Sequence, residues 1–305
     1  MSEATFIEAL RSIATHPAAR GLMDDAAVLD IGGTAIVCTH DMIVEGVHFL
    51  PDDPPEDVAW KLAAVNLSDL AGKGARPIGV LMGYGLTGDS AWDARFIDGL
   101  RVVLETFETP LLGGDTVSLP RGAPRAFGLT AIGQASDGAP PRDGAQAGDA
   151  LWVTGTIGEA GYGLALLQAG EPAPAAPITA YRRPRPLLAE GQALAVHVHA
   201  MMDISDGLLI DAQRMAEASG LAVEIDLEAM PLSSEVAGQK IEARALRLSA
   251  ATAGDDYQLL FAAPCDAVLP VAATRVGRFS AGAGLALVDR TGAVPLPGKL
   301  GYMHD

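Results

Sequence analysis

Positive charge is scarce in this chain of 305 residues, which has 21 lysine and arginine residues against 38 aspartate and glutamate residues. The net charge of −17 argues against binding to nucleic acid, whose phosphates need a basic surface, and against binding to an anionic membrane. A phosphorylated substrate would be repelled as well, unless divalent cations mediate its binding. The composition therefore predicts no nucleic-acid partner and no membrane partner.

Cysteines and long apolar runs are scarce too. The two cysteines, Cys38 and Cys265, lie far apart in the sequence, which favours reduced thiols over a disulfide framework. No apolar run approaches the roughly 18 residues of a membrane span. Residues 1–6 lack a basic stretch followed by an apolar one, which a secretory leader would need. We therefore expect a soluble, cytoplasmic protein.

The length and the local patterns predict two domains of the α+β class. A chain of 305 residues is longer than a typical single core supports, and its hydrophobic content of 49% is ample for burial. Residues 136–148 are rich in proline and glycine and hold almost no large apolar residue, as a boundary loop does. We expect an N-terminal domain over 1–137 and an α+β C-terminal domain over 138–305.

The expected helices and strands alternate irregularly, which favours α+β over a doubly wound sheet. Helices are predicted over residues 5–13, 55–71, 89–107, 158–168, 187–196 and 208–219. Strands are predicted over residues 26–29, 35–39, 78–86, 126–134, 150–155, 200–202, 222–225, 246–250, 257–261 and 285–288.

Aspartates recur where these apolar segments end. They are Asp24 and Asp25, Asp41, Asp69, Asp115, and the pair Asp203 and Asp206. Carboxylates are costly to gather unless a cation or a network of donors holds them, and Mg²⁺ is the simplest cation for oxygen ligands. Each also has an ordinary structural interpretation, such as a solvated pair, a turn, an ion pair of Asp69 with Lys73, or a helix N-cap. Their recurrence favours a metal–phosphate site.

Other motifs of nucleotide chemistry are absent. The segment Gly72-Lys73-Gly74 does not have the spacing of a P-loop, and neither a nucleophile elbow nor a protein-kinase catalytic loop occurs. These absences leave no side chain that a known motif marks as catalytic.

The ordered set of motifs resembles the bacterial thiamine-monophosphate kinases, within the wider aminoimidazole ribonucleotide synthetase-like superfamily. The matching segments run from about residue 20 to the end of the chain. They are Asp24-Asp25-Ala26-Ala27-Val28, Asp41 to Phe49, Asn66-Leu67-Ser68-Asp69-Leu70, Gly113-Gly114-Asp115-Thr116, Gly148 to Gly155, Asp203-Ile204-Ser205-Asp206-Gly207 and Gly254-Asp255-Asp256-Tyr257.

This resemblance implies an N-terminal α/β domain that forms a β-barrel across a homodimer, with ATP near the interface. The implied reaction is transfer of the γ-phosphoryl group of ATP to thiamine monophosphate, with several Mg²⁺ ions, giving thiamine diphosphate and ADP. The implied metal ligands are Asp24, Thr39, His40, Asp41, Asp69, Asp115, Asp203 and Asp206. ATP would contact Gly114, Asp115, Arg142 and Ser205, and the thiamine substrate would contact His48, Asp255 and Tyr302.

Three positions depart from the family pattern, and two other functions compete. Met23 stands where glycine is usual, His40 where a hydroxyl residue is usual, and Asp255 where glutamate is usual. The adjacent Asp256 is an alternative contact for the substrate. The competing functions are another ATP-dependent synthetase or dehydratase of the superfamily, and an acidic, metal-binding nucleotide sensor without turnover.

Overall fold

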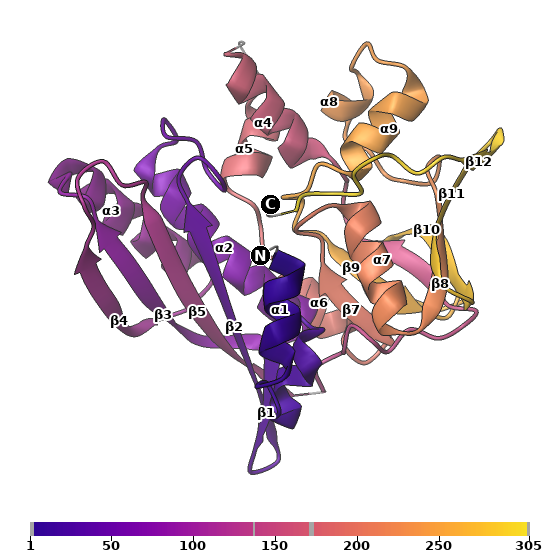
Figure 1. Ribbon diagram of the computed structural model, residues 1–305, viewed down its shortest axis with the longest axis horizontal. Helices are drawn as coiled ribbons and strands as arrows, with labels where there is room; N and C mark the ends of the chain where they lie inside the picture. The colour runs from indigo at the N-terminus through magenta and orange to yellow at the C-terminus, as the bar shows by residue number, and fades with distance from the viewer. Residues whose placement is uncertain (1–2, 137, 171–173, 304–305) are drawn as a thin grey trace.

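The computed structural model describes residues 3–136, 138–170 and 174–303, which form two halves, each built on an open sheet (Figure 1). The N-terminal half contains α1 (Glu3–Arg11), the 3-10 helix η1 (Pro17–Leu22), β1 (Ala27–Ile31), β2 (Thr34–Val44), α2 (Pro55–Gly72), β3 (Arg76–Leu86), α3 (Ser90–Thr106), β4 (Leu111–Ser118) and β5 (Ala126–Ala135). The C-terminal half contains β6 (Ala150–Val153), α4 (Glu159–Ala169), α5 (Ala175–Arg182), α6 (Leu188–Leu194), β7 (Ala200–Asp203), α7 (Leu208–Ala218), β8 (Leu221–Asp226), α8 (Ser234–Ala237), α9 (Ala243–Ala251), β9 (Leu259–Ala263), β10 (Thr274–Ala281), β11 (Gly284–Asp289) and β12 (Gly292–Val294).

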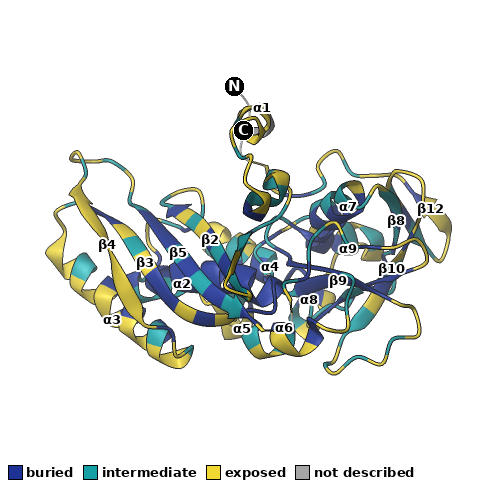
Figure 2. Cartoon of the chain, turned by 90° about the horizontal axis from the view of Figure 1, so that it is seen from below, coloured by how far each residue is buried: buried dark blue, intermediate teal, exposed yellow. Residues whose placement is uncertain are grey.

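The N-terminal sheet has the strand order β1-β2-β5-β3-β4, and α2 and α3 cover one of its faces. Aromatic rings from α3 and two strands join helix to sheet, with Phe96 lying 4.9 Å from Phe127 and 5.1 Å from Tyr84 between ring centroids. Neither α2 nor α3 covers the opposite face, and β4 is exposed along its whole length (Figure 2). We call this opposite face the outer face of the N-terminal sheet.

The C-terminal sheet has the order β12-β11-β8-β10-β6-β9-β7, and α7 packs against β8 and β11. The edge strand β7 lies against α2, so that the two halves meet along this helix. The contact is close at Gly72 of α2, where an added Cβ would lie 3.2 Å from backbone atoms of Met202 and Asp203. This close packing places the end of β7 beside the last turns of α2.

The structure confirms the α+β class and most of the predicted elements. The predicted strand over 246–250 is wrong: it is part of helix α9, whose buried Leu246 and Ala250 are four residues apart, as on one helix face. The helices η1, α5 and α8 and the strands β4, β10 and β12 were not predicted. Neither sheet closes into a barrel within the described chain. Among the described residues, no helix combines the length and the apolar character needed to cross a membrane.

Candidate active site

A cavity of about 320 Å³ lies where the two halves meet. Its polar lining residues come from both halves and include six carboxylates and one lysine. They are Asp25, Asp41, His48, Lys61, Asp69, Asp203, Ser205, Asp206, Asp255, Tyr257 and Tyr302.

Three of these carboxylates form a compact cluster. Asp25 precedes β1, Asp69 lies on α2, and Asp203 ends β7. One oxygen of each lies within 4.8 Å of the others. The tertiary contact between α2 and β7 therefore gathers acids that are up to 178 positions apart in the sequence, since 203 − 25 = 178.

The cluster is short of positive charge. Burial, reinforced by neighbouring carboxylates, raises the pKa of Asp41 to about 6 and that of Asp203 to about 8, and it raises the pKa of Asp69 well above its usual value. Arg142 pairs with Oδ1 of Asp25, but the buried Oδ2 has no hydrogen-bond partner among the described residues and lies 3.7 Å from Lys73 Nζ. A divalent cation would supply the missing charge, and all-oxygen donors suit Mg²⁺. The residues present therefore fit this metal.

Asp24, one of the predicted metal ligands, lies outside the three-carboxylate cluster. Its carboxylate pairs with Arg20 at 2.6 Å and with the buried Lys73 at 2.5 Å. Burial raises the pKa of Asp24, but these two cations outweigh burial and hold the pKa below its usual value. The predicted surface pair of Asp69 with Lys73 is also absent, because Lys73 is fully buried and directed to Asp24. Of the two adjacent acids, Asp25 faces the cavity.

The predicted neighbours Thr39 and His40 lie on opposite faces of β2, because side chains alternate along a strand. The hydroxyl of Thr39 donates a hydrogen bond to Asp69 on the inner face. The imidazole of His40 lies on the outer face, where its Nδ1 is 2.9 Å from the hydroxyl oxygen of Thr130. The side chain of His40 is thus not positioned to bind a metal at the cluster, while that of Thr39 orients one of its ligands.

Gly114 and Asp115 lie on the exposed edge strand β4, away from the cluster of their own chain. Asp115 is aligned with Gly83, Gly128 and Met42 across the sheet, which places it on the outer face. Three strand spacings of about 4.8 Å separate β4 from β2, so about 14 Å lies between them. Gly114 is required by close packing, since a Cβ there would lie 1.9 Å from the carbonyl oxygen of Met82.

Two arginine-based contacts hold the acids in place. Arg142, predicted to bind ATP, forms an ion pair with Oδ1 of Asp25 and does not line the cavity. Arg214, which was not predicted, pairs with Asp206. Both arginines therefore position carboxylates in this structure.

The loop after β7 is organised by Asp211, a residue that the sequence reasoning missed. Its Oδ2 accepts hydrogen bonds from the backbone N–H groups of Ser205 and Asp206, both at 3.1 Å, and of Gly207 at 3.2 Å. The structural alternative, in which Ser205 or Asp206 caps α7, is wrong, because the N-cap is Gly207 and it has no side-chain cap. The only signal in the sequence was a further aspartate one turn into the helix.

The predicted substrate residues His48, Asp255 and Tyr302 all line the same cavity as the acids. Nδ1 of His48 accepts a hydrogen bond from the backbone N–H of Val44 at 3.1 Å. The backbone N–H of Tyr302 donates to the carbonyl of Asp206 at 2.9 Å, which ties the C-terminal segment to the acid loop. The structure thus brings these three residues together from both halves.

Asp255 and Asp256, the two alternative contacts for the substrate, have different surroundings. Asp255 lines the cavity, where its Oδ1 accepts a hydrogen bond from the hydroxyl of Tyr257 at 3.0 Å. Both oxygens of Asp256 instead face the backbone N–H of Gly158, at 2.8 and 3.0 Å, at the start of α4. Asp256 therefore has a structural partner outside the cavity.

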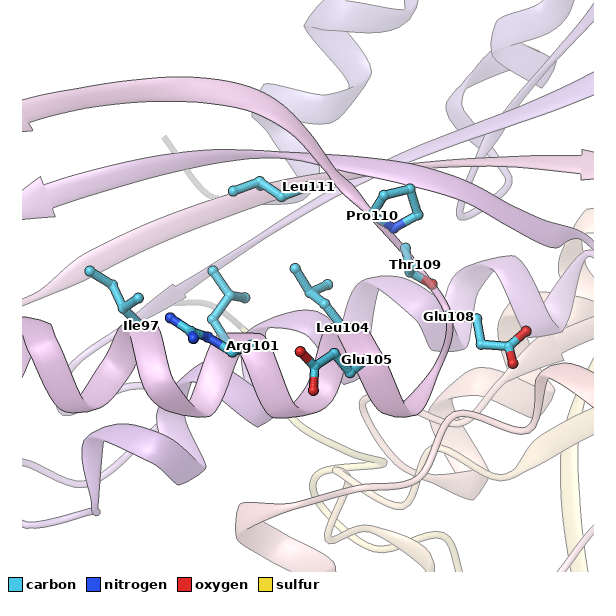
Figure 3. Close-up of a pocket in the computed structure, with 9 residues that line it drawn as sticks. Ile97, Arg101, Leu104, Glu105, Glu108, Thr109, Pro110 and Leu111 are labelled. Atoms are coloured by element: carbon cyan, nitrogen blue, oxygen red, sulfur yellow. The ribbon is translucent and has the colours of Figure 1, made fainter.

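A larger cavity of about 470 Å³ lies elsewhere, between α3 and β4 (Figure 3). Its walls are mainly apolar, with Ile97, Leu104 and Leu111 facing one another and Arg101 and Glu105 beside them. It has no cluster of carboxylates. This cavity would be the candidate active site by volume, but the smaller cavity is the one with a cluster of carboxylates that could bind a metal ion.

Comparison with known proteins places both halves in one family. The chain matches the AIR synthase related protein family, its N-terminal domain over residues 23–135 and its C-terminal domain over residues 146–291. It is 39% identical to the thiamine-monophosphate kinase of Caulobacter vibrioides, over 94% of this chain and 86% of the relative. It is 37% identical to that of Escherichia coli K12, over 80% of this chain and 76% of the relative.

Solved structures agree with these sequences. The structure of AaThiL complexed with AMPPCP and TMP matches 99% of this chain and 97% of its own, with a TM-score of 0.88 and 28% identity. The thiamine-monophosphate kinase from Stenotrophomonas maltophilia K279a matches 93% of this chain and 94% of its own, with a TM-score of 0.75 and 32% identity. The hydrogenase maturation protein HypE in complex with ATP matches 94% of this chain and 92% of its own, with a TM-score of 0.71, and at 20% identity it shares the fold.

Proposed function

The chain belongs to the thiamine-monophosphate kinase family, and we propose that the cavity between its two halves is where it transfers the γ-phosphoryl group of ATP to thiamine monophosphate. The products are thiamine diphosphate and ADP. One observation carries this assignment of the site. Three carboxylates converge within 4.8 Å in a cavity that is also lined by the polar side chains of His48, Asp255 and Tyr302.

The metal end uses the acids that the fold gathers. Asp25, Asp41, Asp69, Asp203 and Asp206 would hold several Mg²⁺ ions, with Asp25 in the place that the resemblance assigned to Asp24. When bound, Mg²⁺ neutralises the donor and acceptor phosphates and favours in-line displacement. The role of the chain is to hold these ligands. Thr39 orients Asp69, Arg142 holds Asp25, and Asp211 fixes the loop that carries Asp206.

No general base is needed for this reaction. The acceptor is a phosphate, whose second pKa of about 6 leaves it largely dianionic at neutral pH. Its oxygen therefore attacks the γ-phosphorus without losing a proton to the protein. The chain contributes position and charge, and the phosphoryl group passes directly from donor to acceptor.

Formation of thiamine diphosphate is expected to depend completely on a divalent cation and to involve no phosphoenzyme. The physical reason is that six carboxylates line the cavity and would repel both substrates without metal. The metal dependence is measured by incubating the protein with ATP and thiamine monophosphate, either with Mg²⁺ or with excess chelator. Chromatography then detects thiamine diphosphate. Labelled phosphate retained on the denatured protein after exposure to [γ-³²P]ATP would contradict the absence of a phosphoenzyme. Absence of thiamine diphosphate under every condition would overturn the proposed function itself.

The substrate end suits the thiamine moiety. Thiamine carries a cationic thiazolium ring and an aminopyrimidine that donates hydrogen bonds. A carboxylate such as Asp255 accepts a charge-assisted hydrogen bond, and the aromatic face of Tyr302 attracts a cation. His48 completes this end from the N-terminal half.

The two proposed domains have different roles. Residues 1–137 bind ATP and metal and form the dimer contact, and residues 138–305 form an α+β domain that supplies the other residues of the site. The outer face of the N-terminal sheet carries exposed apolar side chains, namely Met42 (54%), Leu81 (39%) and Val117 (54%). Exposure of this kind favours burial against a second copy. In such a homodimer, the two sheets would form the β-barrel, and the partner subunit would supply Gly114 and Asp115 to the ATP end. Ser205 contacts ATP from the chain's own half.

A heterodimer of two inactive variants is expected to regain activity. If each site takes Asp203 from one chain and Asp115 from the other, a heterodimer of Asp115→Asn and Asp203→Asn has one intact site and one doubly altered site. Purified with two different tags, it should show about half the activity of the wild-type dimer. Steady-state assays on the heterodimer and both parent homodimers measure this directly.

The matched control combines Asp25→Asn with Asp203→Asn. These residues cluster within one chain, so neither site of that heterodimer is intact and it should remain inactive. Equal inactivity of both heterodimers would mean that Asp115 acts within its own chain or not at all. A monomeric mass by light scattering together with full activity would remove the dimer from the proposal.

A further inference from the structure

Lys61 is the one lysine or arginine that lines the cavity in the described part of the chain. Its side chain is 3% exposed, and its ammonium group is fully occupied. Nζ donates to Oδ2 of Asp255 at 2.8 Å and to the carbonyl oxygen of His48 at 2.9 Å, and it lies 4.0 Å from the centroid of the Tyr181 ring. An ammonium with three N–H donors and these three partners has none left for a phosphate group.

Helix α2 separates this lysine from the metal end. Lys61, Val65 and Asp69 are four residues apart and all line the cavity, so they share one face of the helix. A rise of 1.5 Å per residue puts about 12 Å between Lys61 and Asp69 along the axis. One rigid element therefore sets the spacing between the cluster of acids and the Lys61–Asp255 ion pair.

The two oxygen partners of Lys61 come from different halves of the chain. His48 belongs to the N-terminal half, and Asp255 lies in a C-terminal loop whose backbone is left-handed, with φ of 61° at Asp255 and 48° at Tyr257. Non-glycine residues rarely adopt this conformation, and it persists where surrounding contacts hold it. Lys61 supplies one of those contacts through Asp255, and its bond to His48 links the loop to the N-terminal half. Each oxygen of Asp255 keeps a further lone pair that a ligand can use.

We infer that Lys61 is a positioning residue for the thiamine moiety of the substrate: it holds Asp255 and His48 in place together, about 12 Å along α2 from the metal end. This role rests on the proposed function, because it concerns the organic end of the same cavity. This role also explains why a lysine lies in a site that binds the cationic thiazolium ring. Lys61 neutralises Asp255 and leaves the five other carboxylates to the metal ions.

The test is Lys61→Met, which keeps the length of the side chain and removes its charge. The KM for thiamine monophosphate should rise about 10-fold, while kcat and the KM for ATP stay within about 2-fold. The control Arg182→Met also breaks an ion pair with a buried carboxylate, Asp53, but outside the cavity, and should leave both KM values unchanged. Asp255→Ala and the double variant, measured in the same way, give a double-mutant cycle for the two residues. Since Lys61 acts largely through Asp255, the KM for thiamine monophosphate of the Lys61→Met, Asp255→Ala double variant should be less than about 3-fold above that of Asp255→Ala.

A parallel rise of both KM values, a fall in kcat alone, no change, or single effects that multiply in the double variant would each overturn the role of Lys61. If Lys61→Met does not fold, the double variant still decides, because it leaves no charge unpaired. Failure of the wild-type protein to bind thiamine monophosphate in calorimetry would instead refute the proposed function, before any variant is compared.

Discussion

Replacing Asp203 with asparagine is expected to lower kcat/KM by about three orders of magnitude. Asp203 is 2% exposed and shares the cluster with Asp25 and Asp69 within 4.8 Å, so a neutral amide there weakens the binding of cations that all three ligands share. Steady-state assays at saturating Mg²⁺ measure the loss. The rise in melting temperature that Mg²⁺ gives the wild-type protein should disappear in the variant.

The three acids should behave as one unit. Asp25→Asn and Asp69→Asn alone should each cost about as much as Asp203→Asn, and the triple variant should cost little more, because residues that share a ligand are not additive. Losses that add in the logarithm of the rate would mean that the three carboxylates serve separate sites.

The adjacent pair Asp24 and Asp25 provides the matched control. Asp24→Asn leaves the buried ammonium of Lys73 without its carboxylate partner at 2.5 Å, which costs ~3–5 kcal/mol of folding free energy. This variant should melt at a lower temperature yet keep its stabilisation by Mg²⁺, whereas Asp25→Asn should lose that stabilisation. If Asp24→Asn lost the stabilisation by Mg²⁺ and Asp25→Asn kept it, Asp24 would be the metal ligand.

Asp255→Ala is expected to raise the KM for thiamine monophosphate and to leave the KM for ATP nearly unchanged. Loss of a hydrogen bond to a charged group costs roughly 1.5–3 kcal/mol, which corresponds to about 10- to 150-fold in binding. The variant also leaves Lys61 without its carboxylate partner, so the melting temperature should fall. Initial rates at varied concentrations of each substrate separate the two KM values.

Asp256→Asn is the control for this experiment, because its amide oxygen still accepts from the N–H of Gly158 and its side chain does not line the cavity. Neither KM should change in this variant. A rise of both KM values in Asp255→Ala would assign Asp255 to the metal end. No change in either would mean that the aspartate, shorter than the usual glutamate by one methylene, makes no contact with the substrate.

Most helices of the fold were readable from local patterns, since capping residues, proline and glycine mark their ends. The predicted helix over 55–71 is α2, and the helix over 89–107 is α3, capped by Asp89. The errors occur where patterns are short. Residues 246–250 are helical, and strand β10 is stabilised by its pairing with β6 and β8 from distant parts of the chain. Pairing with strands that are distant in the sequence cannot be predicted from the local sequence pattern.

By itself, the sequence determined the class of the fold, the family and the chemistry of the site, because the types and order of its acidic motifs depend on no coordinates. Only the tertiary structure decided which members of those motifs act together. Strand alternation separates Thr39 from His40, and the buried Lys73 captures Asp24 and leaves Asp25 to the cavity. The packing of α2 against β7 brings Asp69 to Asp203. Such choices depend on which side a residue faces and on which charge lies nearest, and both are properties of the folded chain.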